Sequence, residues 1–226
     1  MAHATSAHVP VLSYDGAMPE PDVSDLLVHL ANGSLESANP RVVDVIVVLA
    51  DASTVAGYPS RVSIGRSQGL TLTPQGATAT MGDDAVIDLS SIVWTCARSS
   101  DGSSASFGTP AAQLSRALAE SLAEAKRAEP RGADAARLSL ALAAVAHGSG
   151  DLRSADRYYR SALGILAMIA GGDRELGDAW ARLASVYRDL GDGASRQSAL
   201  GQAAVFHASA LGEDHPITRH TRASMG

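Results

Sequence analysis

The chain has 226 residues, of which 46% are hydrophobic, and a formal net charge of −6. This length allows one large domain or two smaller ones with separate cores, and we expect two. No apolar run approaches the roughly 18 to 20 residues of a membrane-spanning helix, so we expect no membrane partner.

The sequence favours a cytoplasmic location. Its first residues lack a basic segment followed by an apolar core, so no secretory signal is expected. A single cysteine, Cys96, excludes an intramolecular disulfide and stands in an apolar run, where a buried small residue is expected. Alanine and arginine are abundant and Lys126 is the one lysine, a usage associated with GC-rich bacterial genomes.

The two halves of the chain differ in charge. Residues 1–110 carry four arginines against eleven carboxylates, a balance of −7, whereas residues 111–226 carry fourteen basic and thirteen acidic groups, a balance of +1. Binding to a polyanion requires a surplus of Lys and Arg on one face. Bulk charge therefore argues against nucleic acid as a partner.

The first residues show little periodicity and many turn-forming residues. We expect a flexible arm over residues 1–23. Ser24 and Asp25 can then cap a short helix through Leu30, and Asn32-Gly33 provides a left-handed stop for it.

After Pro40 the pattern changes to β-branched runs of period two, separated by Gly, Pro, Asp and Ser turns. Short strands of this kind close most readily into a small antiparallel β-barrel. We expect that domain to span residues 24–98. The predicted strands are Val42 to Leu49, Val55 to Ile64, Leu70 to Thr73, Val86 to Leu89 and Ile92 to Ala97.

The order of these elements resembles an SH3-like or Sm-like barrel. The resemblance rests on the short helix, the long first hairpin around Asp51-Ala52-Ser53, the Gly69-Leu-x-Leu strand and the closing Ser90-Ser-Ile-Val-Trp strand. Sm-like barrels often bind RNA through basic loops, which makes a nucleic-acid-associated regulator the alternative function. The carboxylate surplus of this region argues against it.

A second alternative is a serine hydrolase. Residues Gly65 to Gly69 fit the G-x-S-x-G nucleophile elbow, with Ser67 as the nucleophile. That motif requires a helix after the serine, whereas Leu70 to Pro74 read as a strand ended by proline. Two glycines suit a hairpin loop equally well, so we assign no catalytic residue and expect no enzyme.

Residues 99–110 are rich in Ser and Gly and are predicted to be a flexible linker between the two domains. A helix is then expected over residues 111–128, with leucines at four-residue spacing and Pro130 beyond its end. A second helix, over residues 135–146, is apolar around its circumference and should be packed on more than one side.

A register recurs at a spacing of 41 residues in the second half. Ser139-x2-Leu-Ala-x2-Ala-x3-Gly-Asp is followed by Trp180-x2-Leu-Ala-x2-Tyr-x3-Gly-Asp. This register resembles the tetratricopeptide repeat, and the long period with the string Leu211 to Pro216 resembles the kinesin-light-chain-like variant. The resemblance implies an α-helical solenoid over residues 111–226. The fold class is thus α+β in two domains.

Two repeats are few for a stable solenoid. The leading helix is expected to cap one end, and the barrel or a second copy of the chain to cover another, which would make a homo-oligomer.

The resemblance to tetratricopeptide repeats implies a non-enzymatic scaffold or adaptor. Such repeats commonly bind a protein or peptide along the concave surface formed by the first helix of each pair. The guanidinium groups there are suited to carboxylates of a peptide, although solvated arginines paired with Asp178 and Asp189 remain an equal alternative. The candidate partner-binding residues are Arg137, Leu140, His147, Arg182, Ser185 and Arg188.

Neither a metal nor a cofactor is expected. The histidines His207, His215 and His220 have no spacing typical of a metal site such as H-E-x-x-H. The aromatic residues of the repeat half are most simply its core.

Overall fold

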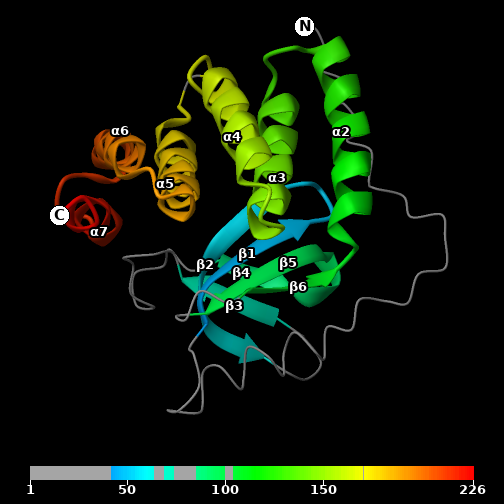
Figure 1. Cartoon of the computed structure of the whole chain (residues 1–226), viewed down its shortest axis with the longest axis horizontal. Helices are drawn as coiled ribbons and strands as arrows, with labels where there is room; N and C mark the ends of the chain where they lie inside the picture. The colour runs from blue at the N-terminus through cyan, green and yellow to red at the C-terminus, as the bar shows by residue number, and fades with distance from the viewer. Residues whose placement is uncertain (1–41, 64–68, 74–84, 100–103, 170) are drawn as a thin grey trace, which may run out of the picture.

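The structure is a computed structural model that describes residues 42–63, 69–73, 85–99, 104–169 and 171–226 (Figure 1). Within these ranges a six-stranded antiparallel sheet precedes six α-helices. The expected N-terminal arm, the expected helix after Ser24 and Ser67 lie outside the described residues. None of the described helices is long and apolar enough to cross a bilayer.

The segments in which side chains alternate with a period of two residues do form strands. Five of the observed strands agree with the predicted ones to within two residues at each end. The strands are β1 (Val42–Leu49), β2 (Thr54–Ser63), β3 (Gly69–Thr73), β4 (Ala85–Asp88), β5 (Ile92–Ser99) and β6 (Ser104–Gly108).

The sixth strand, β6, corrects the expectation of a flexible linker. Residues 104–108 pair with β5, with Ala105 opposite Ala97 and Phe107 opposite Thr95. Half-buried Ala105 and Phe107 alternate with exposed residues, and this alternation fits a strand with one covered face. Serine-rich composition concealed that signal. The proposed division of the chain into two domains stays a prediction.

The strands follow the order β4-β3-β2-β1-β5-β6. In the described part of the chain β4 and β6 are the outer strands and do not pair with each other, so the expected closed barrel is not confirmed. Strand β2 pairs with β1 through its first half and with β3 through its second, across a register shift between Pro59 and Arg61. Over the described residues the strands thus form an antiparallel sheet whose two outer strands are not joined.

Both faces of β1 are buried, because its side chains alternate between two clusters of apolar residues. Val45 and Val47 pack with Leu70 and Leu72 of β3. Ile46 and Val48 face the helices instead. Alternation thus places the next residue of the second set, Asp44, on the face of the sheet that looks toward the helices.

The helices are α2 (Ala111–Ala128), α3 (Ala133–Gly148), α4 (Leu152–Leu166), α5 (Asp173–Leu190), α6 (Gly193–Leu211) and α7 (Pro216–Ala223). Each packs on the next along the chain. In Figure 1 they form one curved layer, from green α2 to red α7, with the sheet beneath. Consecutive helical hairpins arranged in this way form a short helical repeat solenoid.

The same turn joins the helices of both hairpins. Gly150 and Gly191, 41 residues apart, have φ of +81° and +74°, a left-handed conformation that favours glycine. The carboxylate of the next residue accepts a hydrogen bond from a backbone amide of the following helix, at 3.1 Å for Asp151 and 3.0 Å for Asp192. The Gly-Asp positions of the 41-residue register are therefore explained by a turn that both hairpins share.

A polar network joins the two hairpins. The Tyr187 hydroxyl of α5 donates to Asp156 Oδ1 of α4 at 2.7 Å, and Arg160 Nη2 donates to the same hydroxyl at 2.7 Å. Burial, together with the hydrogen bond to Asp156, raises the pKa of Tyr187 to about 12, so the hydroxyl stays protonated and remains a donor at neutral pH.

Replacing Tyr187 with phenylalanine is expected to lower the free energy of unfolding by about 1 kcal/mol, because it removes both hydrogen bonds and leaves the ring. Urea unfolding measures the change. Tyr158→Phe is the matched control: its ring lies 5.1 Å from Arg157, and its hydroxyl makes no hydrogen bond within the described ranges. Equal effects of the two substitutions would contradict the role of the network.

The sheet packs directly on α3. Trp94 and Cys96 of β5, each 1% exposed, belong to the same cluster of buried residues as Leu142 and Val145 of α3. The last residue of α3, Gly148, has no room for a side chain: a Cβ atom there would clash with the Trp94 ring and lie 2.9 Å from Cys96 Cβ. One continuous apolar core therefore spans the sheet and the helices.

Candidate functional site

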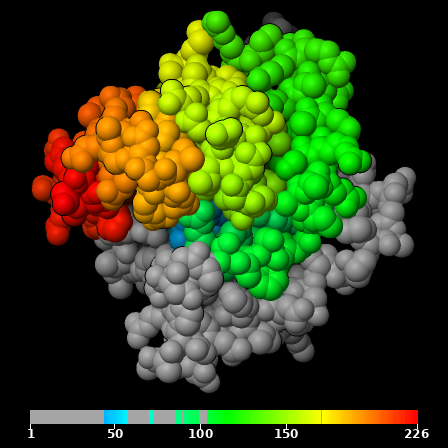
Figure 2. All heavy atoms as spheres, in the orientation of Figure 1, coloured from blue at the N-terminus to red at the C-terminus, as the bar shows by residue number. Residues whose placement is uncertain are grey.

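A pocket of about 550 Å³ lies between the sheet and the last three helices. Its floor comes from β1, β2, β5 and β6, and its roof from α5, α6 and α7. In Figure 2 the helices lie side by side above the strands, and a small blue area of β1 and β2 is visible beneath them. The charged residues that line the pocket are Asp44, Arg98, Asp178, Arg182, Arg188, Asp189 and Arg196.

The 41-residue register explains why the pocket lies under α5 and not under α3. Ala144 of α3 is equivalent to Ser185 of α5, and Ala141 is equivalent to Arg182. On α3 both are buried, at 1% and 0% exposure, whereas on α5 both are half-buried and line the pocket. The sheet thus fills the concave face of the first repeat and leaves a cavity under the second.

Of the six predicted partner-binding residues, three line the pocket and three do not. Arg182, Ser185 and Arg188 all line the pocket. Leu140 is half-buried against the apolar core. Arg137 forms ion pairs with Asp134 at 2.6 Å and with Asp51, in the turn between β1 and β2, at 3.7 Å.

The sixth of these residues, His147, is only 2% exposed, and its Nε2 donates to Asp189 Oδ2 at 2.9 Å. Its other ring nitrogen, Nδ1, has no hydrogen-bond partner among the described residues. Burial, reinforced by the nearby Arg98 charge, lowers the pKa of His147 to about 4. The imidazole is therefore neutral at pH 7 and acts as a contact inside the protein.

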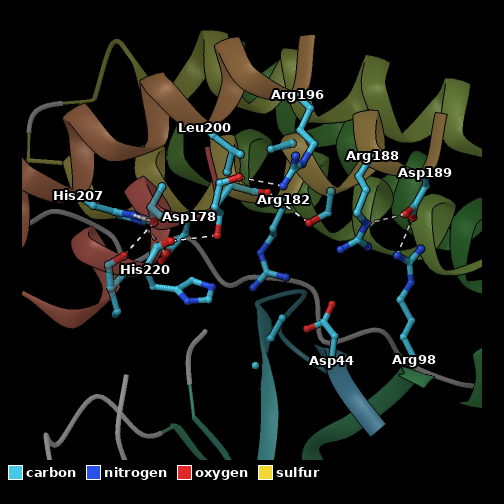
Figure 3. Close-up of a pocket in the computed structure, with 18 of the residues that line it drawn as sticks. Asp44, Arg98, Asp178, Arg182, Arg188, Asp189, Arg196, Leu200, His207 and His220 are labelled. Atoms are coloured by element: carbon cyan, nitrogen blue, oxygen red, sulfur yellow. Dashed lines mark hydrogen bonds and ion pairs between the residues drawn. The ribbon is translucent and has the colours of Figure 1, made fainter. Parts of the chain in front are cut away.

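Asp189 connects three elements. Besides His147 of α3, it accepts from Arg98 of β5 at 2.6 Å and from its neighbour Arg188 at 3.1 Å (Figure 3). Burial alone would raise the pKa of this carboxyl group, but the hydrogen bonds from His147 and Arg98 and the guanidinium charges together lower it. Asp189 is thus ionised at neutral pH and holds the sheet against α5 at one end of the pocket.

The opposite end of the pocket is formed by α6 and α7. His207, 2% exposed, hydrogen bonds with Thr221 of α7 at 3.1 Å and with Asp178 of α5 at 3.2 Å. Arg196 of α6 donates to the Ser224 carbonyl oxygen at 2.9 Å. These contacts fix α7 against the pocket.

Arg182 and Asp44 face each other across the middle of the pocket (Figure 3). Arg182 extends from α5 toward the sheet, and Asp44 extends from β1 toward the helix. In the described part of the chain no carboxylate lies within ion-pairing distance of Arg182, and the Asp44 carboxylate has no hydrogen bond. Burial raises the pKa of Asp44 despite the positive charges of Arg182, Arg98 and Arg188.

The sequence alone did not assign Asp44 or Arg98 to a site. Asp44 offered one signal, since it is a charged residue within an apolar strand. Arg98 offered none, because its role depends on where β5 meets α5. Asp178 was expected on the concave face beside the arginines, as a possible ion-pair partner for them, whereas it contacts His207. Over the described ranges no three His, Cys, Asp or Glu side chains are grouped to hold a metal ion.

The architecture defines a class: a short helical repeat solenoid packed on an antiparallel sheet. Among solved structures, the chain is similar to a protein of Podosopora anserina described as a kinesin light chain with nearly identical TPR-like repeats. The two are 15% identical with a TM-score of 0.44, over 51% of this chain and 56% of that one. This chain thus matches just over half the length of that structure.

Sequence comparison adds no relative. No family model matches the chain, and no curated protein matches it.

Proposed function

We propose that the chain is a non-enzymatic, cytoplasmic scaffold that binds a protein or peptide partner on the concave face of α5. The observation that supports this proposal is that the sheet covers the concave face of the first repeat but leaves a pocket under the equivalent face of the second. The sheet packs on the concave face of α3, whereas Arg182, Ser185 and Arg188 line a pocket under α5. We include in this proposal that the repeats bind a partner as tetratricopeptide-like repeats do. We also include that they are of the kinesin-light-chain-like variant.

The chemistry of this face suits an acidic segment of a partner. Arg182 has no carboxylate of its own among the described residues, and Arg188 is exposed and shares Asp189 with Arg98. A guanidinium group binds a carboxylate through two parallel hydrogen bonds. A partner carboxylate can therefore bind Arg182 without displacing an existing ion pair.

The double substitution Arg182→Glu with Arg188→Glu is expected to abolish partner capture, because it reverses both charges on this face. The full-length chain serves as bait, and captured proteins are identified by mass spectrometry. Arg116→Glu with Arg131→Glu, two exposed arginines outside the pocket, is the matched control. Circular dichroism melting establishes that each variant is folded.

A milder pair, Arg182→Gln with Arg188→Gln, separates loss of binding from loss of folding. It should also reduce capture, since both positive charges are absent and no repulsive charge is added next to Asp44. Unchanged captured proteins with both double variants would show that the α5 face is not the binding surface.

A further inference from the structure

The middle of the pocket contains two charged groups of opposite sign that do not neutralise each other. Arg182 and Asp44 point toward one another from α5 and β1 (Figure 3), yet no ion pair joins them in the part of the chain that the structure describes. The other three arginines of the pocket are engaged: Arg98 and Arg188 with Asp189, and Arg196 with the Ser224 carbonyl oxygen.

A buried tyrosine lies close to Arg182. The Tyr159 side chain of α4 is 0% exposed and does not line the pocket. Burial raises the pKa of Tyr159, while the nearby Arg182 guanidinium opposes that rise. The Tyr159 hydroxyl is thus a neighbour of Arg182 on the side away from the pocket, where no ligand reaches it.

The signs of the charges decide which ligand fits. A lone anion bound to Arg182 would leave Asp44 without a partner, and a lone cation bound to Asp44 would leave Arg182 without one. A molecule with both charges satisfies both groups. The volume of about 550 Å³ falls within the range of about 300–1,000 Å³ that is usual for small-molecule sites.

We propose that this pocket binds a small zwitterion of the amino-acid type, with its carboxylate on Arg182 and its ammonium group on Asp44. This inference needs no protein partner, although the ligand and the partner proposed above would both use Arg182, because the ligand is held by Asp44 on the floor of the pocket as well. An ammonium group next to Asp44 also favours the ionised form of a carboxyl group that burial otherwise disfavours.

The test uses the purified full-length chain without any partner. The proteinogenic L-amino acids are added one by one, at up to about 10 mM, a range that covers the weak affinities of very small ligands. Thermal shift detects binding, and isothermal titration calorimetry measures Kd. For each amino acid that binds, two analogues are compared: the decarboxylated amine and the N-acetylated acid. We expect each analogue to bind at least about tenfold more weakly, since each lacks one charge.

Two substitutions locate the ligand. Asp44→Asn and Arg182→Gln should each weaken binding at least about tenfold, whereas Arg116→Gln, an exposed position on α2, should leave it unchanged. Asp44→Asn removes a carboxyl group whose pKa burial already raises, so this variant should fold.

Several results would overturn the inference: no binding of any amino acid, equal binding of either analogue, or binding that neither substitution weakens. Partner capture is measured separately on the α5 variants. Capture without amino-acid binding would therefore reject only the zwitterion site, and amino-acid binding without capture would reject only the scaffold.

Discussion

Replacing Gly148 with alanine is expected to lower the free energy of unfolding by about 2 kcal/mol. The added methyl group would overlap the Trp94 ring and lie 2.9 Å from Cys96 Cβ, so either β5 must move away from α3 or the ring must leave its buried position. Both responses open the core that the sheet and the helices share. Denaturant unfolding followed by far-ultraviolet circular dichroism measures the loss.

The matched control for this substitution is Gly164→Ala, within α4. A Cβ atom at Gly164 meets nothing within 4 Å, so alanine should stabilise the helix by roughly 0.5–1 kcal/mol through its higher helix propensity. The two glycine-to-alanine changes are thus expected to have opposite signs. If both stabilise the protein, the sheet does not pack against the end of α3.

Acidification from pH 7 to pH 4 is expected to reduce stability by up to about 3 kcal/mol through His147 alone. The imidazole has a pKa of about 4 in the folded chain against an ordinary value of 6.5. Between these values the unfolded chain binds a proton that the folded chain does not, so stability falls as the pH falls. Below this range the loss through His147 is complete.

The variant His147→Gln tests the assignment. Glutamine retains an N–H donor that can reach Asp189 but does not titrate, so this variant should lose much less stability between pH 6.5 and pH 4 than the parent chain. Urea midpoints across that range give the comparison. A decline of the same size in both proteins would assign the pH dependence to other groups.

Much of the fold could be predicted from the sequence because its signals are local. Five strands follow from the alternation of apolar and polar residues. The helix over residues 111–128 follows from its leucine spacing and from the proline beyond its end. Gly150 and Gly191 marked the turns of both hairpins correctly, since a left-handed residue before a capping aspartate is encoded within a few positions.

The arrangement of the parts could not be predicted in this way. The contact of Trp94 with Gly148 joins residues far apart in the sequence, and neither residue type indicates the other. The same holds for Arg98 and Asp189, which determine where the pocket ends. Arg182, predicted as a partner-binding residue, lines the pocket, but its counterpart across the pocket, Asp44, depends on the angle at which β1 passes beneath α5.

The contact at Gly148 also has a mechanical consequence. The backbone of α3 lies directly against an aromatic ring of β5 at this point, and the Arg98–Asp189 pair at 2.6 Å joins β5 to α5 at a second point. Two separate attachments resist a change in the angle between sheet and helices more than one would. We therefore expect the width of the pocket between β5 and α5 to depend on both contacts.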